Sequence, residues 1–267
     1  MQSVDLLIDS TGADSDLRWS RLIVTRRGVD DGVYRAIGYL DQLTGEAEFT
    51  TTYQFTYLAR VAADPAFVPV VGFRDVRRIY RSERLFPSFA DRVMSAKRPD
   101  RPQYLEALDL HADADAWEIL AASGGHREGD PIELISLPRF DRATGETSAH
   151  FLAHGVRHRG KDVSDWITRL PTGHRLGFEP DPTNSVNSQA VKIVDRGMHL
   201  GFVPDPLLDY VHSVIGGGTH ALTVVRANPA ETHPHLRLLL RLVGRCKSFS
   251  FDSPDWSGVQ NRSLGFP

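Results

Sequence analysis

The residues that could bind a charged ligand are concentrated in one short basic run. Arg157, His158, Arg159 and Lys161 form the densest basic cluster in the second half of the chain. Arginine supplies paired donors that match a phosphate group, and a neighbouring planar ring can stack on an unpaired base. The run therefore indicates contacts with nucleic acid, and the alternative is a solvated basic edge strand.

A second group of candidate residues lies further along the chain. Asn184 and Asn187 stand in a turn-rich loop, and Lys192 and Phe202 stand in the two short strands expected after it. An amide can hydrogen-bond a hydroxyl group, and an aromatic ring offers a stacking face. The alternatives are that the asparagines build Asx-turns and that Phe202 is a core residue. We assign all four side chains to the same binding site as the basic run.

These residues occur in an order that resembles the HIRAN domain, a small β-barrel module of some DNA-repair helicases and of free-standing bacterial proteins. The resemblance covers residues 151–226, and three pieces carry it: GVRH at 155–158, DPTNSVNSQA at 181–190 and LGFVP at 200–204. It implies a barrel of the OB or SH3 type. It also implies that an arginine of the first piece contacts a single-stranded DNA end.

The loop departs from the family pattern at two positions. In the helicase-associated members an aspartate near the end of this loop reads the terminal 3′-hydroxyl, and an adjacent aromatic residue stacks on the last base. Asn187 and Val186 stand at those positions here. Asparagine bonds a hydroxyl without charge, and valine has no stacking face. The resemblance therefore implies binding to the DNA backbone more than capture of a 3′ end.

The first half resembles the N-terminal subdomain of HipA-type proteins. The pieces that carry this resemblance are IGYL at 37–40, the β-rich run 49–58, LFPSF at 85–89 and WEIL at 117–120. In that family the segment precedes a kinase domain. No glycine-rich phosphate loop with a following strand lysine occurs in the rest of this sequence, so a kinase function is not implied.

To position the candidate residues we predict an α+β, mainly β protein of two parts. Residues 1–145 form a HipA-N-like α+β domain, residues 146–230 a HIRAN-like β-barrel, and residues 231–267 a helical or extended segment with a tail. Alternation and turn residues predict strands at 19–25, 33–40, 46–57, 131–137, 190–194 and 199–203. Apolar spacing predicts helices within 73–96 and over 104–108 and 113–122.

A second basic segment spans residues 73–101. From Arg74 to Arg101 it carries nine Lys and Arg against four acids, interleaved with aromatic residues. This composition is typical of a surface for nucleic acid or an acidic partner, and equally of an amphipathic helix with buried aromatic side chains. A protein partner docked here, such as a helicase, a nuclease or a toxin-antitoxin component, is the alternative function.

We predict no catalytic residues, no cofactor and no metal site. The single cysteine, Cys246, excludes an internal disulfide and a multi-cysteine zinc site. The acidic residues after His111 lack the glycine and the glutamate of an EF-hand. His233 and His235 need further zinc ligands from elsewhere in the chain, and we interpret them as surface residues.

Composition points to an ordinary globular protein. The chain is 41% hydrophobic and 24% charged, with a net charge of −3, and residues 151–245 carry 11 Lys and Arg against 8 Asp and Glu. Its first residues lack the features of a signal peptide, and no segment has the apolar run of about 20 residues that a membrane span needs. We therefore expect a cytoplasmic, non-enzymatic protein that binds single-stranded DNA or DNA ends.

Overall fold

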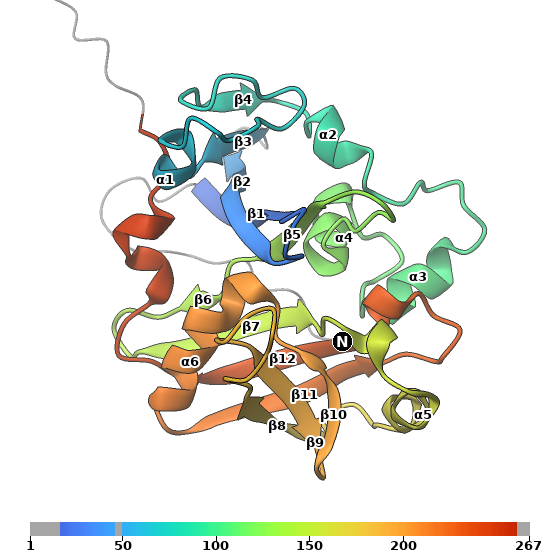
Figure 1. Cartoon of the computed structure of the whole chain (residues 1–267). Coiled ribbons are helices and arrows are strands. Elements are labelled where there is room, and N and C mark those ends of the chain that lie inside the picture. The colour runs from blue at the N-terminus through green and yellow to red at the C-terminus, as the bar shows by residue number, and fades with distance from the viewer. Residues whose placement is uncertain (1–16, 46–49, 261–267) are drawn as a thin grey trace, which may run out of the picture.

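The computed structural model describes residues 17–45 and 50–260, and it contains two antiparallel sheets flanked by short helices (Figure 1). The predicted α+β, mainly β class is confirmed. Our expectation for the first residues of the chain and the start of the strand predicted at 46–57 fall outside the described residues. Among the described residues, no helix has both the length and the apolar character to cross a lipid bilayer.

The first sheet has the strand order β4-β3-β2-β1-β5 and confirms the strands predicted in this half. Its strands are β1 (Leu17–Arg27), β2 (Tyr34–Gly45), β3 (Thr51–Tyr57), β4 (Tyr80–Ser82) and β5 (Ile132–Ser136). The edge strand β5 pairs with β1 and sets Glu133 opposite Thr25. The hydroxyl of Thr25 donates to the Glu133 carbonyl at 2.8 Å, so this part of β5 is fixed by side chain and backbone together.

Four short helices accompany this sheet: α1 (Ala59–Ala62), α2 (Pro87–Ala90), α3 (Arg101–Ala107) and α4 (Ala116–Ser123). Helix α4 follows the sequence prediction closely. Asp115 caps its first turn in a capping box with Glu118, and Gly124 ends it in the left-handed conformation. The turn at Gly124 then starts the loop that leads from α4 to β5.

The helix predicted within residues 73–96 is wrong. This segment consists of turns, the three-residue strand β4 and the single turn α2. Its aromatic side chains instead converge on the sheet: the rings of Phe73 and Phe89 lie 4.3 and 5.7 Å from the ring of Phe55. The near-helical spacing of these residues therefore reflects contacts with one strand residue and not a helical repeat.

The second sheet has the order β10-β9-β8-β11-β12-β7-β6 (Figure 1). Its strands are β6 (Arg139–Phe140), β7 (Glu146–Leu152), β8 (Arg175–Pro180), β9 (Val191–Asp195), β10 (Met198–Phe202), β11 (His220–Ala227) and β12 (Leu238–Arg245). The described strands pair in this open order, so the closed barrel expected over residues 146–230 is not found among them. An isolated bridge between His154 and Phe202 also links the chain after β7 to β10.

Helical turns connect these strands. They are η1 (Val156–His158), α5 (Lys161–Thr168), η2 (Asp205–Leu207), α6 (Leu208–Gly216) and η3 (Pro234–Leu236). The edge strand considered for the basic run is not found at 155–158, where the chain forms η1 instead. Gly155 has a φ of 70°, a left-handed conformation that ends the extended backbone and starts the turn.

The described residues after position 231 contact both sheets. Of the two forms expected after residue 231, the chain adopts the extended one, and β12 lies between β11 and β7. Beyond it, η4 (Ser250–Asp252) and η5 (Pro254–Trp256) return to the first sheet, where the hydroxyl of Tyr39 donates to the Trp256 carbonyl at 2.9 Å. The division at residues 145 and 230 stays a prediction.

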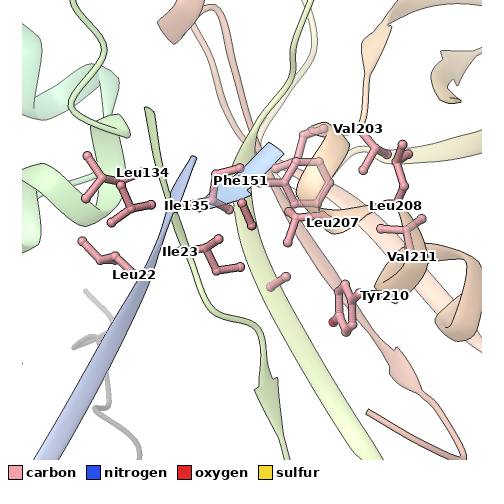
Figure 2. Close-up of a cluster of buried hydrophobic side chains, with 14 of the residues drawn as sticks. Leu22, Ile23, Leu134, Ile135, Phe151, Val203, Leu207, Leu208, Tyr210 and Val211 are labelled. Atoms are coloured by element: carbon pink, nitrogen blue, oxygen red, sulfur yellow. The ribbon is translucent and has the colours of Figure 1, made fainter. Parts of the chain in front are cut away.

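A single cluster of buried apolar side chains joins the two sheets. Figure 2 shows Ile23 of β1 and Ile135 of β5 facing Phe151 of β7, with Leu207 and Val211 behind it. Burying a side chain of this size contributes about 1.5–3 kcal/mol. The shared cluster holds the edge of the first sheet against the second sheet.

Leu240 tests the contribution of the second sheet to this core. It is fully buried at the centre of β12, opposite Phe151 of β7 and Val224 of β11. We expect Leu240→Ala to lower the free energy of unfolding by about 2–5 kcal/mol, because it leaves a cavity. Urea denaturation measures this loss. Val29→Ala is the control, since Val29 is 99% exposed and the change should stay within about 0.5 kcal/mol. Equal losses of unfolding free energy in the two variants would contradict the assignment of Leu240 to the core.

Candidate functional site

Phe202 lies on the outward face of the second sheet. It pairs with Lys192 of β9, and residues opposite each other in an antiparallel ladder project to the same face. In β9 the residues Val191, Ile193 and Asp195 are buried, so Lys192 between them points outward. The half-buried ring of Phe202 is therefore accessible beside a lysine.

Arg159 and His199 complete the surroundings of this ring. The guanidinium carbon of Arg159 lies 5.7 Å from the ring centroid of Phe202, within range of a cation-π contact. One guanidinium nitrogen donates to Nδ1 of His199 at 2.8 Å, and the His199 ring meets Phe202 edge-on at 4.5 Å. The sequence analysis missed His199. A bulge in β10 between residues 199 and 201 brings it next to Phe202, and strict alternation does not predict this.

The other residues of the basic run are exposed to solvent or paired with neighbouring side chains. Arg157 is exposed on η1 and donates through Nε to Nε2 of His158 at 2.9 Å. Burial and the charges of Arg157 and Arg159 lower the pKa of His158, so its ring is neutral at neutral pH. Lys161 forms an ion pair with Asp165 at 2.9 Å on α5 and is 85% exposed.

The asparagine loop is built by its own side chains. Oδ1 of Asn184 accepts hydrogen bonds from the backbone N–H groups of Val186 and Asn187 at 3.0 and 3.1 Å, as in the Asx-turns considered from the sequence. Asn187 donates to Asp205 at 3.0 Å and accepts from the Gln189 backbone at 3.0 Å. Both amides thus shape the loop.

Acidic neighbours partly neutralise Lys192. Its Nζ lies 3.2 Å from Asp181 and 3.5 Å from Glu179. Arg157 and Arg159 have no such carboxylate partner among the described residues. The two arginines therefore carry most of the positive charge that this surface can offer to a ligand.

A second polar site lies where the two halves meet. Glu133 of β5 is only 3% exposed, and its Oε1 lies 2.8 Å from Nε2 of His154 and 3.8 Å from Nε2 of His235. The ring of His126 stacks on that of His235 at 4.4 Å. Our interpretation of His235 as a surface residue is wrong: its side chain is 10% exposed, because η3 folds against the end of α4. His233 is exposed.

The protonation states of this cluster follow from its burial and its one carboxylate. Burial raises the pKa of the Glu133 carboxyl, but the imidazoles of His154, His235 and His126 outweigh it and the pKa falls below its ordinary value. Burial opposes protonation of His154, yet Glu133 raises its pKa. Burial lowers the pKa of His235 to about 4 and lowers that of His126. Neutral imidazoles beside a charged carboxylate are the forms that bind metal ions.

Two left-handed glycines bring His126 to this cluster. Gly124 and Gly125 have φ angles of 68° and 58°. The carbonyl of Gly124 accepts from the backbone N–H of Leu134 at 2.8 Å, which fixes the loop beside Glu133. A side chain at position 125 would meet Leu120 at 2.7 Å, so the turn requires glycine there.

Comparisons with protein families, with curated proteins and with solved structures find no significant match to this chain.

A substitution tests whether the turn that leads to His126 requires glycine at position 125. Gly125→Ala adds a side chain both in a left-handed conformation and against Leu120. The conformation costs about 1–2 kcal/mol and the contact about 1–3 kcal/mol more. Gly129→Ala is the matched control, since its φ is 78° and nothing lies within 4 Å of the added carbon. Urea denaturation should show the larger loss of unfolding free energy for Gly125→Ala. Equal losses in the two variants would mean that the Leu120 side chain moves aside without cost.

Proposed function

We propose that this protein binds single-stranded DNA or DNA ends, without catalysis, through the surface formed by Phe202, Arg159, Arg157 and Lys192. The observation that carries the proposal is the accessible ring of Phe202 with the guanidinium of Arg159 beside it. An aromatic platform flanked by arginines is the common way in which proteins hold unpaired bases and their phosphates.

Each residue has a distinct role in the proposed complex. An unpaired base stacks on Phe202, which contributes about 1–3 kcal/mol per base. Arg157 and Arg159 donate to the phosphates on either side, and their charge-assisted hydrogen bonds exceed neutral ones in strength. Burial, and after it the positive charge of Arg159, lowers the pKa of His199. Its ring is therefore neutral at neutral pH and lies beside Phe202 as a second planar ring.

The resemblance to HIRAN domains supports the same surface. Its first and third pieces meet in the fold, because the backbones of His154 and Phe202 exchange two hydrogen bonds of 2.9 Å beside Gly155. Its loop is tied to η2 by the bond from Asn187 to Asp205. We include in the proposal a HIRAN-like module over residues 146–230 and a HipA-N-like module over residues 1–145.

The second candidate function is docking of a protein partner on residues 73–101. One observation favours it: Val68 and Val71 are 71% and 86% exposed just before this basic segment. Large exposed apolar side chains beside arginines are typical of protein interfaces. This alternative requires no nucleic acid.

Replacing Arg157 and Arg159 together by alanine should weaken binding to single-stranded DNA at least about tenfold. A hydrogen bond to a charged group contributes about 1.5–3 kcal/mol, and 1.4 kcal/mol corresponds to a factor of about ten. Fluorescence anisotropy at low salt measures the affinity. The matched control is Arg77→Ala with Arg84→Ala, which removes the same charge from two exposed positions of the other basic segment.

The pattern of losses separates the two candidate functions. A loss only in the Arg77 and Arg84 variant would move the nucleic-acid site to residues 73–101. If the protein binds neither single strands, duplexes nor 3′-overhangs at low salt, the DNA proposal fails and partner docking replaces it.

Phe202→Leu should lower the affinity about 5- to 150-fold while leaving the salt dependence unchanged. Leucine keeps the apolar volume but removes the stacking face, and stacking contributes about 1–3 kcal/mol per base. Loss of a phosphate contact instead reduces the slope of log affinity against log salt by about one. Affinities at several salt concentrations therefore distinguish the two roles. A changed slope in Phe202→Leu would show that Phe202 positions an arginine and does not itself hold a base.

A further inference from the structure

We propose that His126, Glu133 and His235 bind one divalent transition-metal ion, with Zn²⁺ preferred, at the junction of the two sheets. Each residue offers one ligand atom, and these atoms all lie within 4.8 Å of one another. They come from three separate segments: the loop after α4, strand β5 and turn η3. This proposal does not depend on nucleic-acid binding.

The spacing of the three ligand atoms suits a single ion. Zinc binds imidazole nitrogen and carboxylate oxygen at about 2.0–2.2 Å, so neighbouring ligand atoms of a tetrahedral site are about 3.4 Å apart. Oε1 of Glu133 and Nε2 of His235 are already 3.8 Å apart. All three ligand atoms lie within 4.8 Å of one another, so a pair has to close by at most about 1.4 Å.

Lone pairs of the cluster are left without a protein partner. Neither ring nitrogen of His126 makes a hydrogen bond to a described residue, although the ring is half-buried. Within the described part of the chain, Oε2 of Glu133 accepts no hydrogen bond either, since its bonds use Oε1 alone. These lone pairs are thus available to an ion that lies between them.

The surroundings also hold the ligands as metal sites require. His154 donates to the Glu133 carboxylate at 2.8 Å and fixes its orientation. A hydrogen bond of this kind, from a group behind a ligand, is a regular part of protein metal sites. Nε2 of His235 lies 3.1 Å from the carbonyl of Ser123, and it exchanges this hydrogen bond for the ion when the metal binds, with the ring proton then on Nδ1.

The ligand set selects the class of ion. Two imidazoles and one carboxylate suit zinc and neighbouring transition metals, whereas Ca²⁺ and Mg²⁺ prefer oxygen ligands alone. Three protein ligands leave at least one coordination position for water or for an atom of a bound molecule. The site is close to the proposed DNA surface, since η3 is in contact with η1, which carries Arg157.

Titration of the full-length chain with metal tests the proposal. After chelator treatment and dialysis, isothermal titration with Zn²⁺ should give one equivalent per chain, and Co²⁺ should develop visible absorption from its ligand field. His126→Gln and His235→Gln should each lower the affinity at least about tenfold, since even a lost outer hydrogen bond costs that much. His111→Gln is the matched control, because His111 also lies beside a glutamate, Glu118, at 3.2 Å but is exposed and outside the cluster.

The outcomes are decisive in both directions. The site is supported if His126→Gln no longer binds one equivalent of metal ion per chain and His111→Gln still does. No saturable binding of Zn²⁺ or Co²⁺, or binding unchanged in His126→Gln, overturns it and leaves Glu133 and His154 as a self-contained ion pair. Should His235→Gln fail to fold by circular dichroism, His126→Gln decides, because that side chain makes no hydrogen bond to a described residue.

Discussion

A buried carboxylate governs how the two halves of this protein fit together. Glu133 stands in β5 among the buried residues Ile132, Leu134 and Ile135, and a charge in such surroundings costs several kcal/mol unless it is paired. The first sheet supplies no hydrogen-bond partner for its side chain within the described residues. The partner, His154, comes from the chain just after β7 of the second sheet. The buried charge of Glu133 in the first half is therefore paired only when the second half packs against it.

The same histidine organises the outward surface of the second sheet. Through its side chain His154 neutralises Glu133, and through its backbone it exchanges two hydrogen bonds with Phe202. Gly155 then turns the chain into η1, which carries Arg157. The position of the aromatic ring on the surface is thus set by an interaction in the interior. Through this link, residues from distant parts of the sequence reach one face of the second sheet.

Local patterns in the sequence predicted the elements whose shape is determined locally. The strands of the first sheet, helix α4 and the two strands β9 and β10 all depend on neighbouring residues. The turn between β9 and β10 has positive φ angles at Arg196 and Gly197, as a tight hairpin turn requires. The spacing of the aromatic residues near position 80 predicted a helix that does not form. These side chains are spaced to contact Phe55 of β3, which a local pattern does not reveal.

The candidate site divides in the same way. Arg159, Phe202 and Lys192 were found from residue type and order, and the structure places them on one face. His199, His126 and the buried position of His235 depend on a bulge, a pair of left-handed glycines and the docking of η3. None of these three is visible in the spacing of the histidines themselves. The sequence signal for the junction is an acid in an otherwise apolar strand, Glu133 between Ile132 and Leu134, and our sequence predictions did not use it.

The place of β12 in the second sheet has a consequence for how the chain folds during synthesis. Strand β7 pairs with β12, whose residues follow it by almost the whole length of the second half. While the ribosome is still making that stretch, β7 and β11 each present an unpaired edge, and exposed edges of this kind associate with other chains. The second sheet closes late, once β12 has emerged, so nascent chains halted before this strand are the form of the protein most exposed to aggregation and to the cell's chaperones.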